Sequence, residues 1–211
     1  MASGLSPAIA VSHPVETDST GTQKIHLSIG PIAENSLSGF IHSGISEGKS
    51  CMDQGCIIGA FVNFGINKHF SVQGEMLFNY KTSEFSWTEH SGTYRYWGIC
   101  IPLYVMYSFE LPNKSRMYAG IGPYTDFGLG ARFKEGSHST DVYGRAESSG
   151  LPAMKDSDTG FGLKVGYEWP IGLQINVGYR VSVTNVIDAN SSSVKMYPHA
   201  VSLGIGYRFK L

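Results

Sequence analysis

Large apolar residues alternate with small or polar residues along eight separate segments of this chain. In the last segment, Val201, Leu203, Ile205, Tyr207 and Phe209 alternate with serine, glycine and arginine. Successive side chains of a β-strand point to opposite faces, so this pattern predicts strands with one apolar and one polar face. The eight segments are residues 24–33, 56–65, 70–80, 94–109, 116–133, 160–169, 173–183 and 201–211.

The connections between these segments alternate in length. Residues 66–69, 110–115 and 170–172 are short, whereas residues 34–53, 81–92, 134–158 and 184–197 are long and polar. All short turns therefore lie at one end of the predicted sheet, together with both termini. The pattern predicts an all-β fold, an eight-stranded antiparallel up-and-down barrel whose last strand pairs with its first and removes both sheet edges.

The predicted barrel occupies residues 24–211. Residues 1–23 are polar and show no periodicity, so we interpret them as a flexible N-terminal tail. The first ten residues lack the basic and apolar stretches of a secretory signal peptide.

The polar face of the strands decides between a soluble and a membrane barrel. In a soluble lipocalin-like barrel, which remains the alternative, this face would meet water. Charged residues make up only 16% of the chain, however, below the about 25–35% typical of a water-facing surface. The polar face is rich in glycine and carries charges of both signs, which a narrow lumen can hold and pair. These lumenal candidates are Glu75, Asp126, Lys164, Glu168, Arg180 and Arg208, together with Arg116 and Arg132.

Aromatic residues gather near the strand ends, as they do at the two interfaces of a membrane barrel. Trp97, Trp169, Tyr207 and Phe209 are candidates for these girdles. Long loops at one end and tight turns at the other match extracellular loops and periplasmic turns. The sequence therefore predicts a transmembrane β-barrel in the outer membrane of a Gram-negative bacterium. We expect outer-membrane lipid and lipopolysaccharide around it and both termini in the periplasm.

Several runs resemble the PorT-like outer-membrane β-barrel family of Bacteroidota. The residues of this chain that carry the resemblance most strongly are Pro102, the Ala-Gly-x-Gly-Pro run at 119–123, and Asn185. The resemblance covers about residues 24–211, and it implies an eight-stranded outer-membrane barrel without catalytic residues. Secretion, to which the name-giving member is linked, is not transferred to this chain. The runs are FSVQGEMLFNYK, YWGICIPLYVMYSF, MYAGIGPYTDFGLGARF, DTGFGLKVGYEWPIGLQINVGYRVSVTNVID and VSLGIGYRF.

We expect a structural or interaction role, with the lumen plugged by polar and charged side chains. Glu75 or Glu168 is expected to pair with Lys164 or Arg180. The barrel is a candidate accessory subunit of a larger outer-membrane complex for secretion, assembly or uptake, which would make another outer-membrane or periplasmic protein its partner. The formal net charge of −1 and the lack of a basic run argue against nucleic acid.

No enzymatic site emerges from the spacing of the polar residues. Some eight-stranded outer-membrane barrels modify lipid A with a histidine, a serine and an acid, and such an enzyme is the other alternative. His26 and Ser28 share a face, but it is the lumenal one, and no nucleophile, base and orienting group can be assembled around any of the seven histidines from their spacing. We expect no catalytic residue, cofactor or metal. Cys51 and Cys56 are a candidate disulfide in an oxidising compartment.

Overall fold

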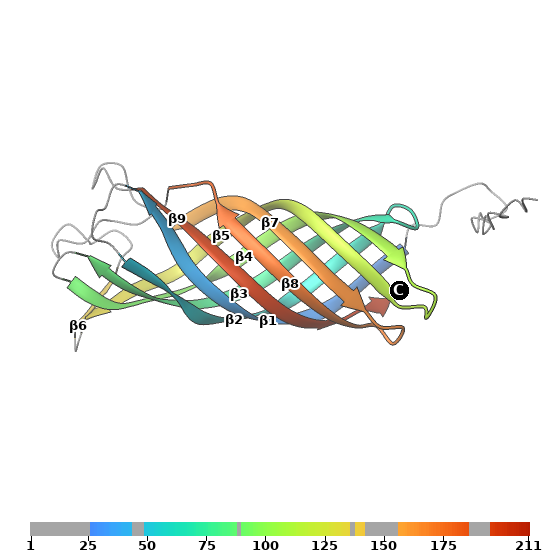
Figure 1. The fold of residues 1–211 in the computed structure, drawn as a ribbon, viewed down its shortest axis with the longest axis horizontal. Helices are drawn as coiled ribbons and strands as arrows, with labels where there is room; N and C mark the ends of the chain where they lie inside the picture. The colour runs from blue at the N-terminus through green and yellow to red at the C-terminus, as the bar shows by residue number, and fades with distance from the viewer. Residues whose placement is uncertain (1–25, 44–48, 88–89, 136–137, 142–155, 186–194) are drawn as a thin grey trace, which may run out of the picture.

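The computed structural model describes residues 26–43, 49–87, 90–135, 138–141, 156–185 and 195–211. They form an elongated barrel of strongly tilted strands (Figure 1). The tail predicted for residues 1–23 lies outside the described residues. Within the described ranges, no helix is long and apolar enough to cross a membrane. The strands are β1 (His26–Ser43), β2 (Lys49–Gly65), β3 (Phe70–Trp87), β4 (His90–Glu110), β5 (Arg116–Glu135), β6 (His138–Asp141), β7 (Ser157–Glu168), β8 (Leu173–Ser182), β9 (Lys195–Tyr207) and β10 (Phe209–Lys210).

The sheet closes on itself through antiparallel neighbours. Its order is β10-β1-β2-β3-β4-β5-β7-β8-β9, and β9 also pairs with β1. Strand β6 is a four-residue addition at the far end of β5, and β10 continues β9 after Arg208. The long strands therefore form the predicted eight-stranded closed barrel. In Figure 1 the C-terminus lies at the end with the short turns.

The pairing fixes the stagger of the barrel, which the sequence pattern does not reveal. Starting from Leu27 in β1 and following directly paired residues once around the barrel returns to β1 at Leu37. The strands are thus staggered by ten residues, and the strong tilt follows from this stagger. The intermediate partners are Phe64, Val72, Val105, Ile121, Leu163, Tyr179 and Val201.

The apolar face of the strands points outward. Along β8, exposed and buried side chains alternate, with Ile175 and Val177 outside and Asn176 inside. The same division holds around the barrel, where large apolar side chains that are about half exposed form a continuous belt. The soluble lipocalin-like alternative is therefore wrong, because such a barrel turns its apolar face inward. Members of the belt are Ile58, Met76, Leu103, Val105, Ile121, Leu163, Val165 and Leu203.

The interior is not entirely polar. Leu77, an exception to the alternation of its segment, has no exposed surface and packs inside the barrel. It belongs to an apolar cluster, and a second cluster lies nearby. Small and charged residues on the polar face therefore share the lumen with apolar packing. The two clusters are Ile32, Ile57, Phe61, Leu77, Cys100 and Tyr124, and Tyr104, Met106 and Tyr118.

The strands are longer at the long-loop end than the alternation predicts. Residues 34–53 are predicted as a loop, but β1 continues to Ser43 and β2 begins at Lys49. Likewise, β3 runs to Trp87 and β4 starts at His90, within the loop predicted for residues 81–92. A strand crosses the hydrocarbon in about 9–11 residues. Beyond that depth, its outer face no longer needs apolar side chains, so the ladder continues after the apolar signal has ended.

Leu163 offers a test of the outward apolar face, because it lies halfway along β7 and is half exposed. We expect Leu163→Arg to lower the free energy of unfolding in lipid vesicles by about 2–4 kcal/mol, the cost of an arginine at the bilayer midplane. Urea titration followed by tryptophan fluorescence measures this change.

Ile171, which is exposed in the short turn between β7 and β8, provides the matched control. Ile171→Arg should cost only about 0–1 kcal/mol, since the interface tolerates arginine. Equal stability of the two variants would contradict the outward orientation of Leu163 into lipid.

Candidate functional site

The middle of the lumen holds a buried network centred on Lys164. The Lys164 ammonium lies 2.7 Å from a carboxylate oxygen of Glu75 and 3.0 Å from one of Glu34. Arg180 approaches the other oxygen of Glu34 at 3.8 Å. All four side chains are at least nine-tenths buried, and two carboxylates face two cations. The network is therefore electrically balanced, as buried charges require.

Strands that are not neighbours supply this network. Glu34 lies on β1, Glu75 on β3 and Lys164 on β7, so the ammonium crosses the lumen to reach both acids. The Lys164 nitrogen also lies 5.4 Å from the ring centre of Tyr104, a cation–π distance. Gly162 makes room for this ring, because a Cβ there would lie 2.8 Å from the Tyr104 hydroxyl oxygen.

A second network closes the lumen toward the long-loop end. One oxygen of Asp126 accepts hydrogen bonds from Lys81 at 2.8 Å and from Asn79 at 3.1 Å. Its other oxygen accepts a 2.5 Å hydrogen bond from the hydroxyl of Tyr96. Lys81 in turn lies over the Tyr96 ring. This carboxylate is thus paired with one cation and held by two neutral donors.

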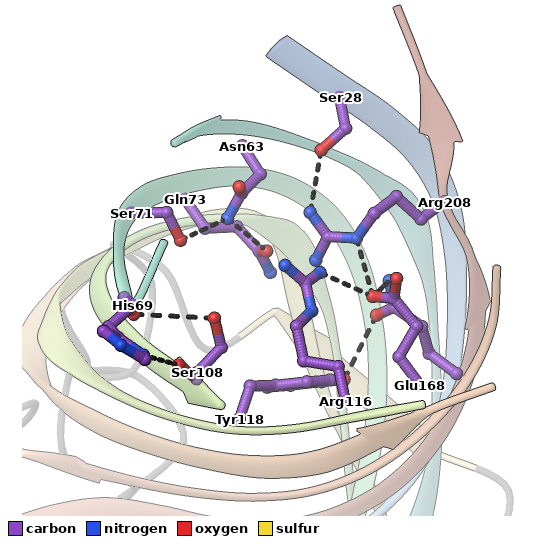
Figure 2. A network of polar contacts seen from close by, with 11 residues as sticks. Ser28, Asn63, His69, Ser71, Gln73, Ser108, Arg116, Tyr118, Glu168 and Arg208 are labelled. Carbon is purple, nitrogen blue, oxygen red and sulfur yellow. Dashed lines mark hydrogen bonds and ion pairs between the residues drawn. The ribbon is translucent and has the colours of Figure 1, made fainter. Parts of the chain in front are cut away.

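A third network lies toward the short turns (Figure 2). Arg116 and Arg208 both reach the same oxygen of Glu168 at 2.7 Å, and Arg208 also donates to Ser28. Gln174 donates to Glu168 and accepts from Tyr118.

The lumenal wall beside this network is also hydrogen-bonded. Asn63 donates to Ser71 and Gln73, and Gln73 donates to Glu75. This path joins the short-turn end of the lumen to the central network.

The structure places all six lumenal candidates inside the barrel. It pairs Glu75 with Lys164, as expected, but Glu168 binds Arg116 and Arg208 rather than Lys164 or Arg180. Arg180 faces Glu34 instead. The six candidates are Glu75, Asp126, Lys164, Glu168, Arg180 and Arg208.

Two members of the networks were missed by sequence reasoning, because they lie in segments predicted as loops. Glu34 follows the apolar part of β1, and Lys81 follows that of β3. In β1 the period-two spacing continues, since Glu34, Ser36 and Ser38 are all buried. The alternation of these polar residues is therefore the sequence signal that could have shown that β1 continues beyond its apolar part.

Arg132 lies outside the barrel, contrary to the prediction of a lumenal position. Its guanidinium lies over the ring of Trp97, at 5.5 Å from the ring centre. The cause is a register shift between β4 and β5: Gly98 pairs with Gly128, whereas Trp97 pairs with Gly130. Leu129 is the extra residue of a β-bulge, and one extra residue exchanges the two faces beyond it.

The girdle candidates lie on the outer face at the two ends of the apolar belt. Trp169 contacts Tyr167 edge-on, and Tyr207 packs on Phe209 at 4.8 Å between ring centres. These four rings lie at the short-turn end. Trp97 lies at the other end.

The candidate disulfide does not fit strand β2. Cys51 and Cys56 lie on the same continuous strand, where five residues span about 16 Å. A disulfide bridges Cα atoms less than about 7 Å apart. Cys56 is a free thiol, and the side chain of Cys51 lies outside the described residues.

Among the described histidines, no imidazole ring hydrogen-bonds a serine hydroxyl, although the Ser108 hydroxyl donates to the main-chain oxygen of His69 at 3.5 Å. The ring of His69 contacts the main-chain oxygen of Ser108 at 3.1 Å and stacks on Tyr107. Ser202 is buried in the lumen, while His199 is partly exposed. In the described ranges, no three His, Cys, Asp or Glu side chains are grouped so that they could hold a metal ion.

The comparisons with known proteins agree with this geometry. The family described as "Outer membrane protein beta-barrel domain" matches residues 8–209. The structure is similar to OprG from Pseudomonas aeruginosa, with a TM-score of 0.54 and 14% identity over 88% of this chain and 95% of that chain. It is also similar to Neisserial surface protein A, with a TM-score of 0.49 and 12% identity over 86% and 97% of the two chains. The likeness to OprG shows the fold. No protein with a curated description matches the sequence.

Lys164 provides a test of the central network. We expect Lys164→Met to lower the free energy of unfolding by about 3–5 kcal/mol, because Glu34 and Glu75 would stay buried without their cation. Converting Glu75 to glutamine in the same chain should restore most of this loss, because Glu34 then remains with Arg180 as its cation. Urea unfolding of the vesicle-inserted protein measures both variants.

Lys210→Met is the matched control, because Lys210 is exposed at the end of the barrel. This variant should unfold as the wild type does. A Lys164→Met protein as stable as this control would contradict the network.

Proposed function

This chain belongs to the outer membrane protein β-barrel family, and on that premise we propose that it serves a structural or interaction role with a closed lumen. The observation that carries the proposal is the chain of charge networks along the interior. Asp126, Lys164 and Glu168 each anchor one network, at successive depths. An eight-stranded barrel has an interior just wide enough for side chains to fill. The paired side chains therefore act as a plug rather than as the lining of a pore.

The proposed orientation has the long loops outside the cell and the termini in the periplasm of a Gram-negative bacterium. Strands β4 and β5, of 21 and 20 residues, are about twice as long as a bilayer crossing requires. Their excess length lies at the long-loop end. Outer-membrane barrels carry short turns on the periplasmic side and longer extracellular loops.

A lipid A-modifying activity has less support than a non-enzymatic role. Such a site needs a nucleophile, a base and an orienting group within hydrogen-bond reach. Among the described residues, the three histidine rings of His26, His69 and His199 make no such contact with a serine hydroxyl. We therefore propose that the protein is not an enzyme. Comparing lipid A by mass spectrometry from cells with and without the protein would overturn this proposal if a modification depended on it.

Within the family, we propose a PorT-like member that acts as an accessory subunit of a larger secretion, assembly or uptake complex. The support is the order and spacing of Pro102, the run at 119–123 and Asn185. The partner would be another outer-membrane or periplasmic protein. Extended strands at the long-loop end provide a rigid platform for the connecting loops, and loops on a rigid scaffold commonly carry recognition.

Conductance in planar bilayers tests the closed lumen. We expect the inserted wild-type protein to show no steady conductance above the baseline, because Lys164, Glu34 and Glu75 cross-link opposite walls. Heat-modifiable migration on a gel confirms in parallel that the protein is folded. Large steady conductance from folded protein would contradict the plug.

Affinity purification from detergent-solubilised native membranes tests the accessory role. We expect one envelope protein to be recovered in near-stoichiometric amount with the tagged barrel. An unrelated eight-stranded barrel, tagged and expressed at the same level, is the control. Recovery of the barrel alone, or of the same proteins with the control, would identify a free-standing barrel.

A further inference from the structure

Small side chains occupy part of the apolar belt on the outer face of β1 and β2. Pro31 and Ala33 of β1 and Ala60 of β2 are exposed there, and Pro31 is the register partner of Ala60. Larger side chains flank them, since Ala60 pairs with Met76 of β3 and Ala33 pairs with Ile205 of β9. The outer wall of the barrel is therefore recessed over β1 and β2.

The recess is an apolar hollow of about 790 Å³. Pro31, Ala33 and Ala60 form its floor, and bulky side chains such as Met76 and Ile205 line its rim. Contacts between membrane-spanning helices are enriched in small residues, because these residues let two backbones approach closely. The same reason applies to a strand wall, so the hollow is suited to close contact with another protein inside the membrane.

Next to the hollow, an amide group points into the hydrocarbon. Asn35 follows Ala33 on the outer face of β1 and is exposed. Leu37, the next outward residue toward the long-loop end, is an exposed apolar side chain, and so is Leu203, the register partner of Asn35 on β9. Asn35 therefore lies within the apolar belt and not at the membrane surface.

The Asn35 side chain makes no hydrogen bond within the part of the chain that the structure describes. Its register partner on β2 is Cys56, an exposed free thiol. Hydrocarbon offers neither a donor nor an acceptor, so a polar group that faces it is costly unless another protein group pairs with it. A lipid acyl chain could fill the hollow, but it cannot satisfy this amide.

A second copy of this chain supplies the matching group. Copies that insert in the same direction pack about a two-fold axis parallel to the membrane normal, and such an axis places identical residues at identical depth. Asn35 can then meet Asn35 of the other copy, and a carboxamide matches itself because it carries both donors and an acceptor. Leu203 and Ile205, beside the hollow on β9, are of a size that the hollow of the other copy accepts.

We propose that this protein forms a two-fold dimer in the membrane through the outer face of β1, β2 and β9. The Asn35 amides pair across the axis, and β9 side chains of each copy enter the hollow above Pro31, Ala33 and Ala60 of the other. This dimer requires only a common direction of insertion. It depends neither on the accessory role proposed above nor on which end of the barrel is extracellular.

Energy transfer in lipid vesicles tests the dimer. Copies that carry a donor or an acceptor dye at the N-terminus are folded together into preformed vesicles, and transfer is followed as added lipid dilutes the protein. We expect transfer from the wild type that falls on dilution, as a reversible dimer requires. Asn35→Leu should weaken association roughly tenfold, because the hydrogen bonds between the two amides are lost. Ala33→Phe should reduce transfer to that of randomly distributed copies, because the new ring fills the hollow.

Matched controls lie on β5, the strand opposite β1 in the closed order of the barrel. Thr125 is partly exposed and Ala119 is exposed on its outer face. Thr125→Leu removes a polar group from this opposite wall, and Ala119→Phe adds the same bulk there. Both variants should self-associate as the wild type does. Heat-modifiable migration on a gel confirms that every variant is folded.

Cys56 provides a second measurement in native membranes, because this exposed thiol lies beside Asn35. In a Cys51→Ser background, we expect a bifunctional maleimide with a flexible spacer to join two copies through Cys56. A Cys51→Ser, Cys56→Ser, Ala119→Cys chain carries its reactive thiol on the opposite wall and should give no joined copies.

Three outcomes overturn the proposal. The first is a wild type that stays monomeric at every ratio of protein to lipid, and the second is an equal loss of transfer in the β1 and β5 variants. The third is a Cys56 product that joins the barrel only to a different protein, which would make the hollow the docking site of an unrelated partner.

Discussion

Closure of the hydrogen-bond ladder between β1 and β9 is the constraint on which the rest of this structure depends. In hydrocarbon no water replaces a missing backbone partner, so a sheet that crosses a membrane must have no open edge. Closing eight strands with a stagger of ten residues fixes the tilt of every strand. The tilt in turn decides which inward side chains share a depth. Glu34 and Lys164 meet for this reason, although 130 residues separate them in the chain.

The stagger also explains why the lumen can hold so many charges. Removing a charge from water is costly unless a partner and further hydrogen bonds replace its hydration. Each carboxylate at the centre of a network has at least one cation within 3.0 Å, and neutral donors occupy further positions. Tyr104, Tyr96 and Tyr118 fill the space between the networks and remain close to charged or polar groups. Polar pairing and aromatic packing together occupy an interior that is too narrow for a wide channel.

Periodicity predicted the closed barrel, the strand order and the outward apolar face, because each is a repeating property of the backbone in lipid. The exact partners were not predictable, because they depend on the stagger. Glu34 illustrates a second limit. It lies in the central network, but the residues that follow it, Asn35 and Ser36, are polar on both faces of β1 and resemble a loop. Leu77 illustrates a third, since an apolar residue inside the barrel breaks the alternation without ending the strand.

The bulge at Leu129 changes the meaning of the residues beyond it. Alternation assigns faces correctly only within an uninterrupted ladder, because one extra residue inverts the assignment. Counted from Phe127, Arg132 falls on the lumenal face; paired with Arg95, it lies outside above Trp97. The flanking Gly128 and Gly130 are the local sign of this irregularity, since glycine within a strand often marks a bulge. A residue that the simple pattern places among the lumenal charges is thereby moved to the outer surface, at the height of the membrane interface.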